Sequence, residues 1–263
     1  MALKKISIII PAYNEADRLP KTLDNYLNYF FGAFQKNFEL ILVTDGCQDS
    51  TPQIASYYSN LYPRVIKHLN FPKRLGKGGA VIQGFKVAEG EIVGFVDADG
   101  SIPPDVIHKL IEVLDNGCWD GVIASRWLNG SRILRYDPVI RRIASRAFNF
   151  LVRSIFDLDF RDTQCGAKFF RRDAIMKVLR ELGTSNFAFD VELLYRLVRS
   201  GHRILEYPVV WSFREGTKVK ILKTPLQMFV SIMRLRVKLS RLKGTFLDKF
   251  MDKVFSLVSR VIV

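Results

Sequence analysis

Cysteine and histidine are both scarce in this chain of 263 residues, which has three of each. The cysteines Cys47, Cys118 and Cys165 are odd in number and lack CxxC spacing, and the N-terminus shows no secretory leader. These absences argue against a disulfide framework and against a structural zinc site. They predict a protein of a reducing compartment, and a cytoplasmic location is the simplest expectation.

Long apolar runs are missing as well, because charged residues interrupt every stretch that approaches the roughly 18 residues of a membrane-spanning helix. The apolar share is nevertheless 48%, enough for a sizeable core, and no segment is of low complexity. The sequence therefore predicts a folded chain that does not cross a membrane by itself. Its length fits one large domain with an appendage.

Acidic residues are the minority among the charges, with 26 Asp and Glu against 40 Lys and Arg and a formal net charge of +14. The excess is concentrated in residues 125–172, with 11 basic against 4 acidic, and in residues 201–263, with 13 against 4. Such basicity favours a polyanionic partner: a nucleic acid, an anionic lipid headgroup or a phosphorylated substrate. Composition alone does not choose among the three.

The first half of the chain alternates short apolar runs with longer amphipathic stretches, a pattern typical of a parallel sheet covered by helices on both faces. The predicted strands span residues 6–10, 40–43 and 92–96, and the predicted helices span 17–34, 51–61 and 78–89. This order predicts an α/β fold, Rossmann-like and doubly wound, with a mostly parallel central sheet. Ligands of such sheets bind beyond the carboxyl ends of the strands, so the polar residues after each strand are the candidates for a site.

The second half of the chain is less regular and ends in a basic tail. It predicts strands at 121–124 and 209–213, helices at 139–156 and 189–200, and a loop at 161–168. We assign residues 1–220 to a catalytic domain and residues 221–263 to a tail of two basic amphipathic helices. The apolar stripes of the tail can pack on the domain, pack on a partner subunit in a homodimer, or lie on a membrane surface. The membrane surface is the favoured expectation, because basic side chains beside an apolar stripe suit anionic headgroups.

Two carboxylates stand directly after the strand at 92–96. Asp97 and Asp99 can both turn toward the crevice, where oxygen ligands hold Mg²⁺ or Mn²⁺ against substrate phosphates. The alternative is that they cap the helix that begins near Pro103 and Pro104. The motif alone does not decide between the two.

Two further motifs follow neighbouring strands. Asp45 can accept a hydrogen bond from the N–H groups of a nucleobase. The segment RLGKGG at 74–79 has glycines that permit close backbone approach, and its Lys77 can contact a phosphate or a ribose. The alternative for the glycines is a simple turn.

Seven motifs in order resemble the glycosyltransferases of family 2, which have the GT-A fold, over about residues 5–220. They are PAYNE at 11–15, DGCQD at 45–49, GKGG at 76–79, DADG at 97–100, SR at 125–126, RDTQCG at 161–166 and FAFDVE at 187–192. Within the family the chain looks most like the dolichyl-phosphate β-glucosyltransferases and dolichyl-phosphate mannose synthases. UDP-glucose and GDP-mannose both stay open as donors.

With this resemblance the nucleotide-sugar site is expected to comprise Pro11, Ala12, Tyr13, Glu15, Asp45, Gly76, Lys77, Asp97 and Ala98, with Asp97 and Asp99 binding Mg²⁺ or Mn²⁺. Two departures stand out, because the family usually has Asp at the position of Thr44 and Ser at that of Cys47. They leave the choice of base open. The transmembrane helices that relatives often add are also missing.

The resemblance implies an acceptor that is a dolichyl or polyprenyl phosphate, which is largely a dianion at neutral pH and needs cations more than a base. The expected phosphate contacts are Arg126, Arg141, Ser145, Lys168, Arg214 and Lys218. The expected catalytic residues are Asp99, Asp162, Asp190 and Arg126, of which Asp162 and Asp190 have no fixed role. The expected location is the cytoplasmic face of a membrane, with peripheral attachment.

Two other functions compete with this expectation. A saccharide hydroxyl in the synthesis of a cell-surface polysaccharide is an alternative acceptor for the same fold. A basic nucleic-acid-binding protein is the alternative from a different class, but the interleaved aromatic and basic residues of a stacking platform are lacking. No nucleic-acid partner is therefore expected.

Overall fold

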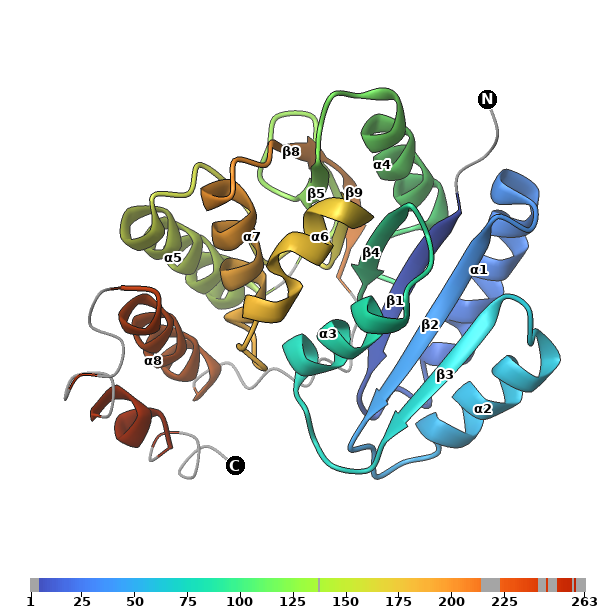
Figure 1. The fold of residues 1–263 in the computed structure, drawn as a ribbon, viewed down its shortest axis with the longest axis horizontal. Coiled ribbons are helices and arrows are strands. Elements are labelled where there is room, and N and C mark those ends of the chain that lie inside the picture. The colour runs from blue at the N-terminus through green and yellow to red at the C-terminus, as the bar shows by residue number, and fades with distance from the viewer. Residues whose placement is uncertain are drawn as a thin grey trace.

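A seven-stranded sheet forms the centre of the computed structural model, which describes residues 5–136, 138–213, 223–240, 245, 250–256 and 258. The strand order is β3-β2-β1-β4-β7-β5-β8 (Figure 1). The strands are β1 (Ile6–Ala12), β2 (Phe38–Asp45), β3 (Ile66–Phe71), β4 (Ile92–Val96), β5 (Gly121–Ser125), β7 (Ala167–Arg171) and β8 (Ile204–Pro208). All neighbours pair in parallel except β7, which runs antiparallel to both β4 and β5.

Helices cover both faces of the sheet (Figure 1). One face packs on α1 (Leu19–Phe34), α2 (Thr51–Leu61) and α4 (Pro104–Asn116). The other packs on α3 (Lys77–Val87), α5 (Val139–Phe156), α6 (Arg172–Val178), α7 (Phe189–Arg199) and α8 (Lys223–Lys238). A short 3₁₀ helix, η1 (Leu179–Glu181), follows α6, and β6 (Arg132–Arg135) pairs with β9 (Val210–Ser212) in a separate two-stranded sheet.

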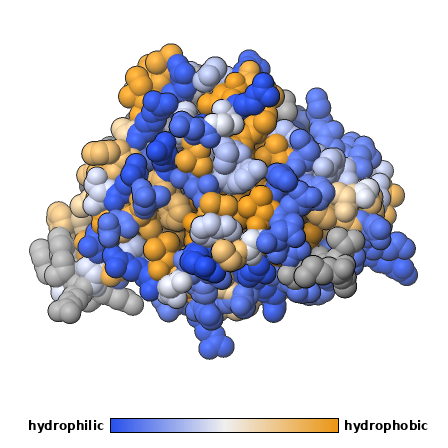
Figure 2. All heavy atoms as spheres, turned by 90° about the horizontal axis from the view of Figure 1, so that it is seen from above, coloured by the Kyte–Doolittle hydropathy of each residue, from blue (hydrophilic) through white to orange (hydrophobic). Residues whose placement is uncertain are grey.

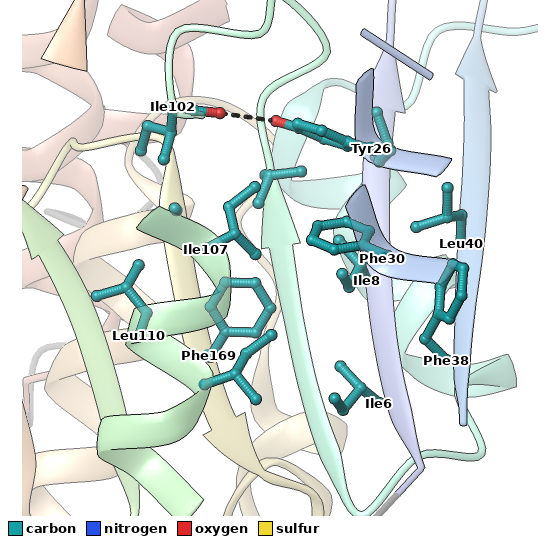
Figure 3. Packing of buried hydrophobic residues seen from close by; sticks show 14 of the residues in the cluster. Ile6, Ile8, Tyr26, Phe30, Phe38, Leu40, Ile102, Ile107, Leu110 and Phe169 are labelled. Carbon is teal, nitrogen blue, oxygen red and sulfur yellow. Dashed lines mark hydrogen bonds between the residues drawn. The ribbon is translucent and has the colours of Figure 1, made fainter. Parts of the chain in front are cut away.

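Alternation along β1 divides the core into two layers. Ile8 and Ile10 point into the layer on the α1 side, whereas Ile9 points into the layer on the α3 side. Figure 3 shows the first layer, where Ile8 lies beside Phe30 of α1, and the hydroxyl of Tyr26 donates to the carbonyl oxygen of Ile102 at 3.2 Å. Strands covered on both faces read as continuous apolar runs, and this is the pattern that made β1, β2 and β4 predictable.

The predicted doubly wound, mostly parallel sheet is confirmed, but three of its strands were not predicted. β3 and β8 are only partly buried and carry polar residues among the apolar ones. β7 overlaps the end of the segment predicted as a loop at 161–168, and it contains the fully buried Lys168. A buried lysine breaks the apolar pattern from which a strand is inferred, because lysine is almost never buried without a partner.

The first helix of the tail packs on the domain. Ile232 and Leu235 of α8 are buried in the layer that also contains Val152 of α5, so this part of the apolar stripe is covered by protein. For these two residues the alternative of packing on the domain is confirmed, and the expected membrane contact of the tail stays a prediction. Of the second tail helix, residues 250–256 and 258 are described and helical, and the rest of it, like the boundary near residue 220, lies outside the described residues.

Candidate active site

The carboxyl ends of β1, β2 and β4 open onto a cavity of about 520 Å³. Pockets of this size are typical of sites for small ligands and cofactors. The strand ends supply a polar wall, and α5 and α8 supply a largely apolar one. Of the residues expected at the nucleotide sugar, all but Gly76 line the cavity. Three residues expected at the acceptor phosphate line it too: Arg126, Arg141 and Ser145.

The loops after β1 and β2 are joined into one unit at the polar wall. The backbone N–H of Glu15 donates to Oγ1 of Thr51 at 2.7 Å, and that of Gln48 donates to Oδ1 of Asn14 at 2.8 Å. Asn14 adopts the left-handed conformation, with φ of 53°, which places its side chain over the second loop. The PAYNE and DGCQD motifs are therefore two halves of one wall.

Arg74 links Tyr13 to Asp45 within this wall. Its guanidinium carbon lies 3.4 Å from the centre of the Tyr13 ring, and its Nη1 donates to Oδ2 of Asp45 at 2.8 Å. The backbone N–H groups of Leu75 and Gly76 donate to the same carboxylate, the second at 2.9 Å. Asp45 therefore lines the cavity but already holds the 74–76 loop, and a nucleobase that bonded to it would have to take the place of Arg74.

The glycines after Arg74 pack closely against the segment before α7. The backbone N–H of Gly78 donates to the carbonyl oxygen of Ser185 at 2.9 Å, and a Cβ on Gly78 would lie 2.4 Å from Cβ of Phe189. Gly76 has φ of +81°, and a Cβ there would lie 2.3 Å from the same carbonyl oxygen. Gly76 therefore has no room for a side chain because the segment before α7 lies against it, and its expected contact with the nucleotide sugar stays a prediction.

Lys77 contacts the first carboxylate of the DADG motif. Its Nζ lies 3.0 Å from Oδ1 of Asp97 and 3.7 Å from Oδ2 of Asp190. Burial by itself lowers the pKa of Lys77, but the Asp190 and Asp97 carboxylates outweigh it and raise this pKa above its ordinary value. Burial has the opposite effect on an acid: it raises the pKa of Asp97, although the Lys77 ammonium opposes this shift. An ammonium beside Asp97 marks a position that favours positive charge.

The residues at the end of β4 fit a divalent ion bound together with a diphosphate. Asp97 and Asp99 both line the cavity, and Oδ1 of Asp99 accepts a hydrogen bond from the backbone N–H of Ser101 at 2.9 Å. Across the part of the chain that the structure describes, no group of three or more His, Cys, Asp or Glu is placed to hold a metal. Two hard oxygen donors leave the remaining ligand positions to phosphate oxygens and water, as is usual for Mg²⁺.

Gly166 gives Asp97 the space that it occupies. The carbonyl oxygen of Gly166 accepts a hydrogen bond from the backbone N–H of Asp97 at 2.9 Å. A Cβ on Gly166 would lie 2.1 Å from Oδ2 of Asp97. The last residue of the RDTQCG motif is therefore a glycine because the carboxylate lies directly against it, a role that the sequence did not predict.

Arg126 is fixed by Asp162. The Asp162 carboxylate accepts from Nε of Arg126 at 2.7 Å, from Nη2 at 3.0 Å and from its backbone N–H at 3.0 Å. Burial opposes ionisation of Asp162, but the Arg126 guanidinium and these hydrogen bonds lower its pKa below the ordinary value. Asp162 is fully buried and does not reach the cavity, so its expected catalytic role is corrected to that of a positioning residue.

Lys168 and Asp190 form a buried pair behind the polar wall. Nζ of Lys168 lies 2.6 Å from Oδ1 of Asp190 and donates to the carbonyl oxygen of Cys165 at 2.7 Å. Both side chains are fully buried and neither lines the cavity. The expected phosphate contact of Lys168 is therefore corrected, because its ammonium is buried against Asp190. Asp190 reaches the site only through Lys77, whose Nζ lies 3.7 Å from its Oδ2, so its expected role becomes that of a positioning residue. Arg214 and Lys218 lie outside the described residues.

The apolar wall comes from helices that are far apart in the sequence. Phe148 and Leu151 of α5, Met228 and Phe229 of α8, and Phe187 before α7 line this wall. None of these was singled out as a site residue from the sequence. The helical spacing of Arg141, Ser145 and Phe148 was the available signal, because residues three or four apart share one face of a helix.

The fold and the site together define a glycosyltransferase of the GT-A class: a mostly parallel sheet with one reversed strand, and a carboxylate pair at the end of β4 beside a nucleotide-sized cavity. The chain belongs to glycosyl transferase family 2, whose family model matches residues 7–179.

Curated relatives extend the match beyond the family model. The chain is 35% identical over 233 residues to glycosyltransferase AglD of Haloferax volcanii, covering 88% of this chain and 36% of AglD. It thus spans about a third of that relative's length. The human dolichyl-phosphate β-glucosyltransferase is 33% identical over 245 residues, covering 89% of this chain and 76% of the human protein.

Solved structures share the fold. A Pyrobaculum calidifontis mannosyltransferase in complex with GDP-Man and Mn²⁺ gives a TM-score of 0.61 at 16% identity, covering 98% of this chain and 70% of that one. Glucosyl-3-phosphoglycerate synthase of Mycobacterium tuberculosis in complex with Mn²⁺, UDP and glucosyl-3-phosphoglycerate gives a TM-score of 0.64 at 18% identity. The match covers 89% of this chain and 80% of that one.

Proposed function

We propose that this chain transfers a hexose from a nucleotide diphosphate sugar to the phosphate of a dolichyl or polyprenyl phosphate. The observation that supports this proposal is that one cavity is lined by Asp97 and Asp99, by Arg126 and Arg141, and by apolar side chains of α5 and α8. We assign the carboxylates to the donor end and the arginines with the apolar side chains to the acceptor end. Glucose is the favoured sugar, because the human relative at 33% identity is named as a dolichyl-phosphate β-glucosyltransferase.

The polar end would hold the donor. Asp97 and Asp99 would bind Mg²⁺ or Mn²⁺, which supplies positive charge to the departing diphosphate. Lys77, already beside Asp97, adds a second cation at the same place. Tyr13 offers an aromatic face for the nucleobase, provided that Arg74 moves aside.

The other end would hold the acceptor. One phosphate oxygen forms a bond to the anomeric carbon of the sugar as the bond from that carbon to the diphosphate breaks, with inversion. The second pKa of a phosphate monoester is about 6, so the attacking oxygen is already deprotonated at neutral pH and no side-chain base is needed. Arg126, held bidentately by Asp162, presents a fixed cation to this phosphate, and Arg141 and Ser145 approach it from α5.

The place of action follows from the acceptor. A polyprenyl phosphate resides in a bilayer, so we expect peripheral attachment at a cytoplasmic membrane face. Within the described ranges, no helix has the length and apolarity that crossing a bilayer requires. Attachment would then depend on surface contacts.

The test is a donor and acceptor screen. The protein is incubated with Mn²⁺ or Mg²⁺, radiolabelled UDP-glucose or GDP-mannose, and polyprenyl phosphate, polyprenol or a soluble oligosaccharide. We expect label in the organic phase with polyprenyl phosphate only, and more from UDP-glucose. Label on the oligosaccharide, or no lipid product with any donor, would reject the proposal.

A further inference from the structure

We infer that the outer face of α5, with the end of β6 before it, docks this protein onto an anionic lipid bilayer. The surface consists of six apolar residues, called here the α5 outer stripe: Leu134, Tyr136, Val139, Ile140, Ile143 and Phe150. All six are between 58% and 71% exposed. The inference concerns where the protein meets the membrane and goes beyond the proposed choice of donor and acceptor.

Helical geometry places Val139, Ile143 and Phe150 on the side of α5 away from the catalytic cavity, and puts Ile140 at the border with the cavity-lining face. At about 100° per residue, Val139, Ile143 and Phe150 fall within about 40° of one another around the helix axis. Arg141 and Phe148, which line the cavity, fall on the opposite side of the same helix. One helix thus forms a wall of the cavity with one face and exposes an apolar stripe with the other.

A basic stripe runs beside the apolar one. Arg142, Arg146 and Arg153 follow one another at helical spacing, next to Ile143 and Phe150. The sequence from 127 to 156 contains one acidic residue, Asp137, against six arginines. An apolar stripe flanked by arginines is the composition of a helix that lies in the headgroup region of an anionic membrane.

Two of these arginines are oriented by aromatic rings. The guanidinium carbon of Arg142 lies 4.9 Å from the centre of the Tyr136 ring, and that of Arg146 lies 4.9 Å from the centre of the Trp127 ring. Tyrosine and tryptophan rings favour the membrane interface, where an apolar body meets a polar surface. The contacts thus bring cations and interfacial aromatics together on one surface.

The contrast with α8 locates the docking surface. The apolar residues Ile232 and Leu235 of α8 are buried against the domain, so they are not available to a bilayer. Hydrophobic residues also reach the surface in other places, in patches broken by hydrophilic ones on the face drawn in Figure 2. Scattered exposure of this kind is normal for a folded protein. The α5 outer stripe differs because Val139, Ile143 and Phe150 follow one face of α5, with Ile140 at its edge and Leu134 and Tyr136 shortly before the helix.

The test measures binding to vesicles of phosphatidylcholine with or without phosphatidylglycerol, by co-sedimentation of the full chain. The variant combines Ile140→Asp and Ile143→Asp, neither of which lines the cavity. The matched control combines Tyr57→Asp and Leu61→Asp, which replace residues of α2 that are 63% and 52% exposed. Circular dichroism checks that both variants are folded.

We expect the Ile140/Ile143 variant to bind anionic vesicles about tenfold more weakly than the unchanged protein, because two apolar anchors are replaced by charges. The control should bind like the unchanged protein, and added salt should weaken binding of both. Unchanged binding by the variant would overturn the inference. So would a stripe-dependent dimer in light scattering, which would show that a second copy covers the stripe.

The outcome is separable from that of the proposed function. Vesicle binding is measured without donor or acceptor, and transfer is measured with a short-chain polyprenyl phosphate dispersed in detergent. We expect the Ile140/Ile143 variant to keep transfer in detergent and lose it with acceptor in vesicles. Stripe-dependent binding without any transfer would reject the proposed function alone, and transfer with stripe-independent binding would reject this inference alone.

Discussion

The two ends of the cavity are built in different ways. The polar end consists of loops that directly follow parallel strands, so Tyr13, Asp45 and Asp97 meet because the strands do. The apolar end consists of side chains from α5 and α8, which lie far apart along the chain and meet only through tertiary packing. The polar end is therefore fixed by sheet topology, whereas the other depends on how two helices pack.

This difference teaches which changes should affect which substrate. A substitution at the strand ends should alter donor and metal binding, and a substitution on α5 should alter acceptor use. Two buried carboxylates behind the walls, Asp162 paired with the cavity-lining Arg126 and Asp190 paired with the buried Lys168, should show their effects through position and stability. Five substitutions test these assignments.

Asp99→Ala should have the largest effect, a loss of transfer of about 10³-fold or more, because one of two carboxylate ligands is removed from the metal. The fold should be unchanged, since Asp99 hydrogen-bonds to Ser101 in its own loop and not to a distant element within the described residues. Initial rates measure the loss of transfer, and thermal unfolding checks that the fold is unchanged. Asp105→Ala, which removes an exposed carboxylate from α4, is the control. If the Asp99→Ala variant kept its transfer activity, Asp99 would not be a ligand of a metal that the reaction requires.

Lys168→Met should mainly lower stability. It leaves the buried Asp190 with only the more distant Lys77 ammonium, at 3.7 Å, and breaking a buried ion pair costs about 3–5 kcal/mol of unfolding free energy. Urea unfolding measures the loss. If Lys168 instead held the acceptor phosphate, the variant would keep its stability and raise the KM for the lipid.

Arg126→Lys should lower transfer about 100-fold while donor affinity stays the same, because lysine keeps the charge but cannot make the bidentate contact with Asp162. Arg153→Lys is the control, because Arg153 makes an exposed ion pair with Asp159 on the outer side of α5. Calorimetric titration with donor and Mn²⁺, next to initial rates, separates the two effects. A matching loss of donor affinity would place Arg126 at the polar end.

Gly166→Ala should weaken Mn²⁺-dependent donor binding about tenfold, because its Cβ would displace the Asp97 carboxylate. The KM for the acceptor should change little. Gly183→Ala serves as control, because a Cβ at Gly183 meets no atom within 4 Å. Electron paramagnetic resonance of Mn²⁺ reports metal binding directly, and equal affinity in both variants would contradict the role given to Gly166.

The polar end was predictable from the sequence because strand ends have a local signature. Asp97 and Asp99 follow a buried apolar run, and parallel strands bring such residues to the same edge of the sheet as Asp45. The exception was Gly76, where the sequence cannot tell a glycine that approaches a ligand from one that approaches the segment before α7. Glycine serves both purposes for the same steric reason.

The apolar end and the buried pairs were not predictable, because their contacts are long in sequence. From the sequence alone, Lys168 is indistinguishable from a surface cation. Its partner Asp190 lies 22 residues further along the chain, and only the fold shows that the two are paired. The apolar stripe of α8 reads the same whether a membrane or a neighbouring helix covers it. Only the packing of α8 against α5 decides between the two.

Arg141→Gln tests the division of the cavity most directly. The KM for polyprenyl phosphate and the Kd for UDP-glucose with Mn²⁺ are measured on the same preparation. We predict that the KM rises about tenfold, because one guanidinium is removed from the acceptor phosphate, and that the Kd stays within about twofold. A Kd that rises tenfold with an unchanged KM would contradict the account, since Arg141 would then belong to the donor end.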